Sequence, residues 1–508
     1  MGFAAVHSRA VWGLQAPRVT VEVHLANGLP SFTLVGLADT EVREARERVR
    51  SAILNSGLAF PSNQRITVNL APADLPKESG RFDLPIAVGI LAASGVLPVR
   101  ELAGYEFAGE LSLSGDVRPV RGALAMAQAV FQEGAASAMV LPLGSAQEAA
   151  LVPQARVISV ATLKEVAQAL SHPSQDTSAW QFLPAPKSFV QAIDGKEGDL
   201  QDIHGQAGAK RALEIAAAGG HSLLLVGPPG AGKSMLAQRL RGLLPTLGTA
   251  QALQTAAIHS MKGQLDVAHW GVRPFRHPHH SATLAALVGG GAPPRPGEIS
   301  LAHHGVLFLD ELPEFSRLAL EALREPLETG SISLARAGYQ TEFPAKFQLV
   351  AAMNPCPCGF LGMTKPACRC SPDQVARYQG RISGPLWDRI DMHVAVHALS
   401  PEVLLQGKKG ESSALVRQRC AQAHDLAWQR QSGSNRDLTQ AQLQALALKP
   451  QASRMLARTA EQHAWSARAT HRLLRLARTI ADLAGEEVID EMHVAEATQY
   501  RLLLGQKS

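Results

Sequence analysis

The stretch Ser222-Leu223-Leu224-Leu225-Val226-Gly227-Pro228-Pro229-Gly230-Ala231-Gly232-Lys233-Ser234 decides the fold of this chain. The apolar run before Gly227 predicts a buried parallel strand, and Met235–Leu240 has the periodicity of a helix. A glycine-rich loop between strand and helix surrounds a phosphate with backbone N–H groups and a helix N-terminus. Residues 227–234 are therefore predicted to bind a nucleoside triphosphate, with Lys233 at the β/γ-phosphates and Ser234 on Mg²⁺. A chance match is the alternative, which both flanks disfavour.

Composition limits the class of protein. With 508 residues, the chain has room for about two to four domains, each with its own core. A formal net charge of +5 permits binding to nucleic acid without demonstrating it. Five cysteines give no disulfide framework, the N-terminus lacks a signal-peptide pattern, and no apolar stretch is long enough to cross a bilayer. We expect a cytoplasmic α/β protein without membrane contact.

Residues 1–170 are predicted to form an α+β domain ahead of the phosphate-binding loop. Alternating apolar residues predict strands at 19–25 and 31–35. The turn sequence Asn27-Gly28-Leu29-Pro30 predicts that these two strands pair as a hairpin. A capped helix is expected over 40–55.

The remainder of the chain divides by composition. Residues 171–200, rich in Ser, Pro, Gln and Asp, predict a linker to a core at 201–398. Residues 399–508 are predicted to be a helical lid, because Pro and Gly separate apolar-periodic segments. Those segments lie near 411–431, 438–447, 451–463, 466–484 and 490–503.

Two further strands of the core end in polar side chains. Asp310 and Glu311 follow the apolar run 306–309, and Asn354 follows 347–353. Because the carboxyl ends of parallel strands meet at one edge of a sheet, these groups are predicted beside the phosphate loop. Asp310 would hold Mg²⁺ through water, Glu311 would orient or deprotonate the attacking water, and Asn354 would contact that water or the γ-phosphate. A plain Asn-Pro turn is the alternative for Asn354.

Two segments of the core are candidates for other ligands. Residues 276–280, Arg-His-Pro-His-His, match no standard zinc spacing, so histidines hydrogen-bonded within the core are favoured over a metal site. Residues 331–343 predict a hairpin whose tip carries Arg336 and Tyr339. A cation and an aromatic ring can pair with a phosphate and stack on a base. Arg336 and Tyr339, with Lys346 behind them, are candidate DNA contacts; a solvated tip is the alternative.

Four cysteines lie within residues 356–370, directly after Asn354: Cys356, Cys358, Cys368 and Cys370. Two closely spaced pairs can surround one tetrahedral Zn²⁺, which would be structural because four thiolates leave no open position. Reduced structural thiols and disulfides are the alternatives, and a reducing compartment disfavours the latter.

These motifs, in this order, resemble the ComM/YifB family of magnesium-chelatase-like AAA+ ATPases over nearly the whole chain. The first domain resembles the family's Lon-protease-like domain in three segments, 32–37, 69–77 and 109–111. Lon-type proteolysis needs a Ser–Lys dyad. The corresponding positions here hold about Phe82 or Asp83 and Ala123–Met126, so the resemblance implies the fold without the peptidase.

The resemblance also assigns residues around the nucleotide and in the pore of a ring. It implies Ile203 and Gln206 beside the adenine, although a plain helix start explains them equally well. It implies that Arg295, in the Gly/Pro-rich segment 287–299, is a pore-loop cation; a solvated loop is the alternative.

Two arginines are assigned by the resemblance to the γ-phosphate. Arg389, in Leu386-Trp387-Asp388-Arg389-Ile390-Asp391, would be an arginine finger that reaches the ATP of a neighbouring subunit. An ion pair with Asp388 or Asp391 is its alternative. Arg468 would be the sensor 2 arginine, touching the ATP of its own subunit from the lid.

Membership of this family implies a homo-hexameric, ATP-driven DNA helicase. Its substrate would be branched or forked DNA with single-stranded tails, and its task branch migration during homologous recombination in natural transformation. The alternative is a magnesium-chelatase motor subunit that remodels a protein partner.

Overall fold

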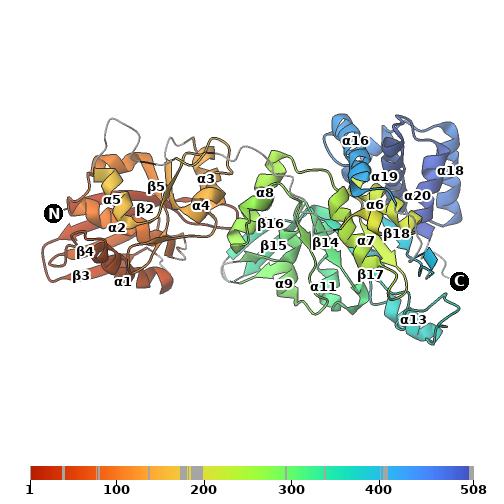
Figure 1. Ribbon diagram of the computed structural model, residues 1–508, viewed down its shortest axis with the longest axis horizontal. Helices are drawn as coiled ribbons and strands as arrows, with labels where there is room; N and C mark the ends of the chain where they lie inside the picture. The colour runs from red at the N-terminus through yellow and green to blue at the C-terminus, as the bar shows by residue number, and fades with distance from the viewer. Residues whose placement is uncertain are drawn as a thin grey trace. The chain divides into compact units, whose positions relative to one another are not determined.

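The computed structural model describes residues 2–36, 40–75, 77, 80–134, 138–171, 180, 182–184, 198–291, 294–336, 339–400, 402–403 and 410–502, with backbone alone at 40–43, 336, 339–340 and 502. The chain divides into two compact units (Figure 1). The N-terminal unit comprises Met1–Val190 and Ala252–Trp270. The second unit, Gln191–Gln251 and Gly271–Ser508, is called the motor unit after the activity that the resemblance predicts for it.

The N-terminal unit is built on a mixed seven-stranded sheet of order β3-β4-β2-β1-β5-β8-β9. Its strands are β1 (Gly2–Arg9), β2 (Arg18–Ala26), β3 (Ser31–Val35), β4 (Arg65–Ala71), β5 (Tyr105–Phe107), β8 (Ala138–Pro142) and β9 (Val157–Val160). The predicted hairpin between the second and third strands is wrong, because β4 lies between them, antiparallel to β2 and parallel to β3. The Asn-Gly turn connects the two strands without pairing them, since each forms its ladder with β4.

Helices pack on this sheet: α1 (Thr40–Asn55), α2 (Asp83–Ala93), α3 (Ala123–Gln132), α4 (Leu143–Ala149) and α5 (Leu163–Ser171). The helix expected over 40–55 is confirmed with these bounds. The helix α2 is buried along its whole length. Its Gly89 allows close approach to the sheet, because a Cβ there would lie 2.6 Å from Val23 Cγ2. A short hairpin joins β6 (Glu110–Leu111) to β7 (Val117–Arg118).

Helix α8 (Thr249–Lys262) follows the phosphate-binding loop in sequence, yet from Ala252 onward it belongs to the N-terminal unit. The Ser260 hydroxyl donates to Glu148 Oε2 at 2.5 Å, and Gly122 N donates to Ser260 O at 3.3 Å. Ser260 is fully buried, so α8 is held by contacts to α4 and to the turn before α3.

Most of the expected linker, 171–200, lies outside the described residues. Its described residues 180 and 182–184 lie against the N-terminal sheet. Leu183 N donates to Val157 O at 2.9 Å, and the Trp180 ring lies 5.5 Å from the Tyr105 ring, centroid to centroid.

The motor unit contains a parallel five-stranded sheet of order β11-β14-β17-β10-β18. The strands are β10 (Leu223–Val226), β11 (Phe275–Arg276), β14 (Val306–Leu309), β17 (Gln348–Met353) and β18 (Met392–Ala395). All four pairings are parallel. Because β17 lies between β10 and β14, its polar end at Asn354 is placed between the phosphate loop and the acidic pair.

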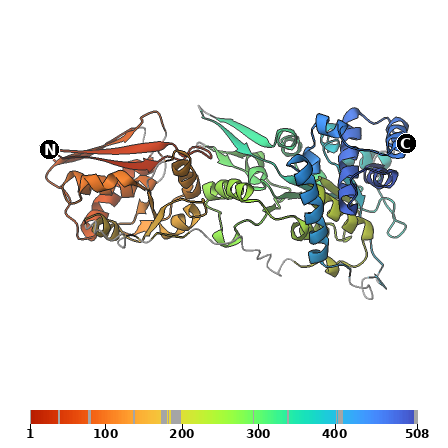
Figure 2. The same cartoon turned by 90° about the horizontal axis from the view of Figure 1, so that it is seen from above.

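Helices and two hairpins complete the motor's core. The helices are α6 (Ala207–Gly219), α7 (Lys233–Leu240), α9 (Leu284–Val288), α10 (Glu298–Leu301), α11 (Arg317–Glu321), α12 (Arg324–Thr329), α13 (Pro372–Gln379) and α14 (Gly384–Trp387). One hairpin pairs β12 (Gly289–Gly290) with β13 (Arg295–Pro296), and the other pairs β15 (Ser331–Arg336) with β16 (Tyr339–Pro344). Figure 2 shows the β15–β16 hairpin projecting from the body of the motor unit.

The C-terminal part is helical, as expected: α16 (Ser413–Gln431), α17 (Gln440–Gln444), α18 (Pro450–Gln462), α19 (Ala467–Ala484) and α20 (Glu491–Leu502). These helices share one apolar core with β10 and α6, so the lid and the sheet form a single body. The expected α/β class, with a parallel sheet around the predicted phosphate loop and a helical C-terminal region, is confirmed. Within the described part of the chain, no helix is long and apolar enough to cross a membrane.

Candidate ATP site and cysteine cluster

Lys233 is the first residue of α7, and its ammonium group contacts the loop that connects β10 to α7. Lys233 Nζ donates to Gly227 O at 2.7 Å, to Pro228 O at 2.8 Å and to Asn354 Oδ1 at 3.0 Å. Burial lowers the pKa of Lys233, and the charge of Asp310 opposes that shift. A phosphate oxygen in this place would give the ammonium group an anionic partner beside three neutral oxygens. The side chain expected to bind the β/γ-phosphates thus lies against the amide expected at the γ-phosphate.

The hydroxyl and the carboxylate expected to bind Mg²⁺ are in direct contact. Ser234 Oγ donates to Asp310 Oδ2 at 2.5 Å across the space between α7 and the end of β14. Both are hard oxygen donors, which suit Mg²⁺, a cation that takes few protein ligands and keeps several waters. The residues present therefore fit this ion.

Glu311 lies next to Asp310 and has an unusual backbone. Its φ of +52° lies in the left-handed region, which costs energy for a residue with a Cβ. Its amide donates to Asp310 Oδ1 at 2.9 Å. This geometry leaves the Glu311 side chain 56 % exposed beside the phosphate loop, where it can reach a water molecule.

Sequence reasoning missed the neighbour of this carboxylate. His280 Nδ1 lies 3.3 Å from Glu311 Oε2, and the His279 and His280 rings lie 4.1 Å apart between centroids, tilted by 35°. The histidine-rich segment was expected to hydrogen-bond within the core, whereas His280 contacts Glu311, the candidate general base. The signal lay in the position of the segment directly after β11, which ends at the same sheet edge as β14.

Of the two residues implied beside the adenine, Gln206 contacts the phosphate loop. Gln206 Nε2 donates to Ala231 O at 3.3 Å and to His397 O at 2.7 Å, and Gln206 has a left-handed φ of +54°. Ile203 is buried, and its carbonyl accepts a hydrogen bond from Lys210 Nζ. Both are thus tied to the start of α6, which runs into β10.

Arg389 and Arg468 meet at one acid. Arg389 Nη2 forms an ion pair with Glu328, at the end of α12, and Nη1 donates to Pro385 O at 2.7 Å. Arg468 Nη1, at the start of α19, lies 3.9 Å from the same Glu328 oxygen. The Arg389 side chain is 10 % exposed and that of Arg468 is 83 % exposed. The alternative pairing of Arg389 with an adjacent aspartate is replaced by this contact with α12.

Asp391 anchors the Arg389 segment to the base of the phosphate-loop strand. Ser222 N and Ser222 Oγ each donate to Asp391 Oδ2 at 2.9 Å, and Asp391 N donates to Ser222 Oγ at 2.8 Å. Burial alone would raise the pKa of Asp391, but the charges of His221 and Arg472 hold it below its usual value. The segment carrying the candidate finger is therefore connected to β10 itself.

The candidate DNA contacts come from the two hairpins. Arg295 is exposed on β13. A Cβ on Gly289, in the paired strand β12, would lie 3.2 Å from Leu334 Cδ1, so the two hairpins pack together. The side chains of Arg336 and Tyr339 lie outside the described residues. Lys346 is exposed at the base of the second hairpin, where its stem covers Gly330.

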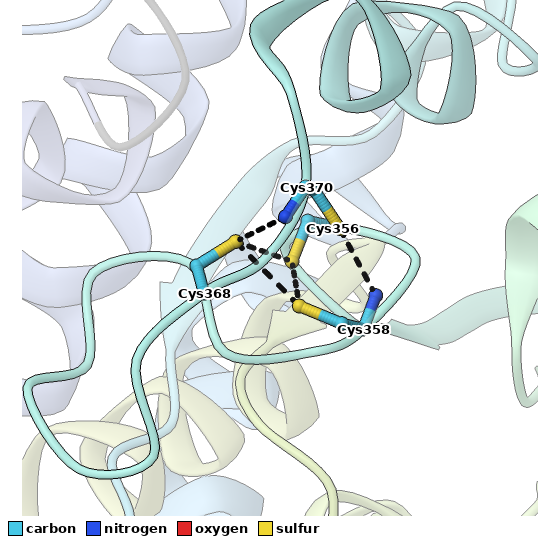
Figure 3. Close-up of side chains that lie close together, drawn as sticks. All are labelled: Cys356, Cys358, Cys368 and Cys370. Carbon is cyan, nitrogen blue, oxygen red and sulfur yellow. Dashed lines mark hydrogen bonds between the residues drawn. The ribbon is translucent and has the colours of Figure 1, made fainter.

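The four cysteines gather at one point after β17 (Figure 3). Sγ–Sγ distances are 3.4 Å for Cys356–Cys358, 3.7 Å for Cys356–Cys368 and 3.5 Å for Cys358–Cys368, and all four sulfurs lie within 4.8 Å of one another. A disulfide needs about 2.0 Å, whereas four thiolates at about 2.3 Å from one Zn²⁺ are about 3.8 Å apart. Backbone N–H groups of Arg369 and Phe360 lower the pKa of Cys358 to about 6, which favours the thiolate. Among the described residues, this is the one cluster of three or more His, Cys, Asp or Glu side chains whose ligand atoms could hold a metal ion together.

The peptidase positions of the N-terminal unit are filled by a buried ion pair and apolar helix residues. Arg48 Nε donates to Asp83 Oδ2 at 2.7 Å. Burial raises the pKa of Asp83 to about 6, although Arg48 opposes it. Ala123–Met126 are buried in α3.

Comparisons with known proteins agree with this arrangement. Family models match residues 21–144 (subunit ChlI of Mg-chelatase), 199–404 (magnesium chelatase, subunit ChlI) and 410–501 (magnesium chelatase, subunit ChlI C-terminal). Competence protein ComM of Haemophilus influenzae is 48 % identical over 512 residues, which cover 99 % of this chain and 98 % of the relative. The YifB proteins of Salmonella typhimurium and Escherichia coli are 47 % and 46 % identical over 507 residues, with the same coverage.

Proposed function

Because the chain belongs to the family of magnesium-chelatase-like AAA+ ATPases that includes ComM and YifB, we propose that it is an ATP-driven DNA helicase. It would promote branch migration during homologous recombination in natural transformation. The observation that carries the proposal is the convergence of Lys233, Asn354, Ser234 and Asp310 beside Glu311. The full-length similarity to competence protein ComM supports DNA as the substrate.

In this proposal each side chain of the ATP site has one task. Lys233 binds the β/γ-phosphates, Asn354 orients the γ-phosphate or the water, and Glu311 accepts the proton of the attacking water. Ser234 and Asp310 hold Mg²⁺, which neutralises charge on the phosphate oxygens when bound. Ile203 and Gln206 form the wall beside the base, since they join the start of α6 to the loop.

Arg389 supplies the arginine finger of a neighbouring subunit's site. A finger that acts between subunits requires a ring, for which we propose a homo-hexamer. Arg468 shares Glu328 with Arg389, so we place both arginines on the same intersubunit surface. This proposal differs from the expectation that Arg468 contacts the ATP of its own subunit. Glu328 pairs with both arginines, and we propose that the γ-phosphate of the neighbouring subunit's ATP replaces Glu328 as their partner.

The packed hairpins carry the DNA contacts of the proposal. Arg295 on the first hairpin and Arg336 on the second offer phosphates two cations, and Tyr339 offers a base a stacking surface. Lys346, exposed at the base of the second hairpin, is a further proposed phosphate contact. Branched or forked DNA with single-stranded tails is the proposed ligand, and a cytoplasmic location gives access to it.

We further propose that the four cysteines hold one structural Zn²⁺. The sulfur separations support this over free structural thiols. The loop is mostly exposed, so a bound metal would stabilise it in place of an apolar core. Elemental analysis of the purified protein that finds no stoichiometric zinc would remove this part of the proposal.

The alternative function is a magnesium-chelatase motor subunit that remodels a protein partner, which the names of the three family models favour. Strand displacement on forked and Holliday-type DNA decides between the two. We expect ATP-dependent displacement by the wild type and none by Lys233→Ala. ATP hydrolysis without displacement on either substrate would refute the helicase and leave the remodelling motor.

A further inference from the structure

The cysteine cluster begins where the ATP site ends. Asn354, whose amide oxygen accepts from Lys233, is separated from Cys356 only by Pro355. The far end of the segment returns to the same place, because Gln379 Nε2, on α13, donates to Pro355 O at 3.0 Å. The strand end that carries Asn354 is therefore held from both sides of the cluster.

The segment also presses on the phosphate loop. Gly359 is buried, and a Cβ there would lie 2.5 Å from Pro229 Cδ and 3.7 Å from Asn354 Cγ. Gly359 N donates to Cys356 O at 3.0 Å, so the turn that touches Pro229 is closed by a cysteine of the cluster. Pro229 lies inside the loop that surrounds the phosphates.

Residues 356–370 contain no helix or strand, and 361–362 and 364–367 are exposed. Such a segment loses its conformational entropy without an apolar core to offset the loss. Backbone amides point at sulfur instead: Cys358 N donates to Cys370 Sγ at 3.4 Å, and Cys370 N to Cys368 Sγ at 3.5 Å (Figure 3). These bonds hold the four sulfurs around one point, and a metal bound by all four would tie both ends of the segment together.

We propose that the metal-loaded cysteine cluster is a positioning element of the ATP site, which holds Asn354 and Pro229 where a nucleotide needs them. This inference rests on the proposed zinc and ATP sites and goes beyond a purely structural metal. Loss of the metal frees the segment, Gly359 withdraws from Pro229, and the phosphate loop loses its support. Nucleotide affinity then depends on metal content, although no cysteine touches the nucleotide.

Two glycines of the segment provide a matched test. Gly359 and Gly362 have the same φ of +83°, so Gly359→Ala and Gly362→Ala carry similar backbone strain. Only the Cβ at 359 meets another group, since the position at 362 is open for 4 Å around. Titration of a fluorescent ADP analogue measures the ADP affinity of each full-length variant. Gly362→Ala reports the effect of backbone strain alone, and Gly359→Ala adds the contact with Pro229 to that strain.

We expect both variants to retain one zinc per chain, and Gly359→Ala to bind ADP at least about fivefold more weakly than Gly362→Ala, as overpacking against Pro229 requires. Removal of zinc from the wild type with a thiol reagent and chelator should weaken ADP binding likewise, and reduction with added zinc should restore it. Equal ADP affinities of the two variants, or unchanged affinity after zinc removal, would overturn the proposal. Wild-type protein that binds ADP in a zinc-dependent manner but unwinds no DNA would refute the helicase alone.

Discussion

Replacement of Glu148 by glutamine should stabilise the N-terminal unit at alkaline pH and leave it nearly unchanged in acid. Glu148 receives a 2.5 Å hydrogen bond from Ser260 on α8. Burial raises the pKa of Glu148 from 4.5 to about 7, although Ser260 opposes that shift. A carboxyl group with the higher pKa in the folded state binds its proton more tightly there. Stability therefore falls as pH rises through this interval.

The size of the effect follows from the pKa. At about 1.4 kcal/mol per pH unit, a pKa raised from 4.5 to about 7 costs the folded state at most about 3.5 kcal/mol once the group is ionised. Between about pH 5 and about pH 8, the difference between Glu148→Gln and wild type should grow by about 2 kcal/mol. Glutamine stays neutral and can still accept a hydrogen bond from the Ser260 hydroxyl. Because the two proteins differ only at residue 148, the pH dependence that comes from all other titrating groups cancels in the difference.

Urea denaturation, followed by tryptophan fluorescence, measures this difference at both pH values. A full-length background with Trp387→Phe, Trp428→Phe and Trp465→Phe leaves tryptophans in the N-terminal unit alone. Glu47→Gln, which removes an exposed carboxylate from α1, is the control and should show no pH-dependent gain. Parallel pH profiles for wild type and Glu148→Gln would refute the argument that burial keeps Glu148 protonated against α8.

Three further changes test the motor and the core. Arg389→Ala, mixed into wild-type protein, should reduce ATPase activity more than in proportion to its fraction, because the finger is worth about a thousandfold or more to a neighbour; a linear loss contradicts action between subunits. His280→Ala should lower kcat about tenfold with little change in KM, because it removes the imidazole that lies 3.3 Å from Glu311 Oε2 and helps to fix that side chain. His280→Gln should recover most of the loss, and equal rates would exclude a positioning role. Arg9→Met should cost about 3–5 kcal/mol in urea unfolding, because buried Glu106 loses the guanidinium 2.7 Å away and keeps only Arg18 at 3.7 Å. A loss below about 1 kcal/mol, the size of an exposed pair, would contradict a stabilising role for this buried ion pair.

Local patterns anticipated a large part of this molecule. The helix over 40–55, the lid helices and the hairpin at 331–344 occur where periodicity and turn residues placed them. These elements are specified by neighbours in sequence, since caps, glycines and apolar spacing act within a few residues. The expected pairing of β2 with β3 failed for the opposite reason. Residues 65–71 form β4, which pairs with both β2 and β3 in place of the predicted hairpin. No local sequence pattern indicates this pairing.

The sequence by itself predicted the parts of the candidate ATP site: a phosphate loop, an acidic strand end and an Asn-ended strand. Each is recognisable because its residues are contiguous. Only the tertiary structure decided which groups are neighbours. It set Asn354 beside Lys233, His280 beside Glu311, Glu328 between two arginines, and Gly359 against Pro229. It also assigned α8 to the N-terminal unit, although α8 follows the phosphate loop in sequence. Such contacts arise from strand order and helix packing, which depend on residues far apart in the chain and leave no mark on local spacing.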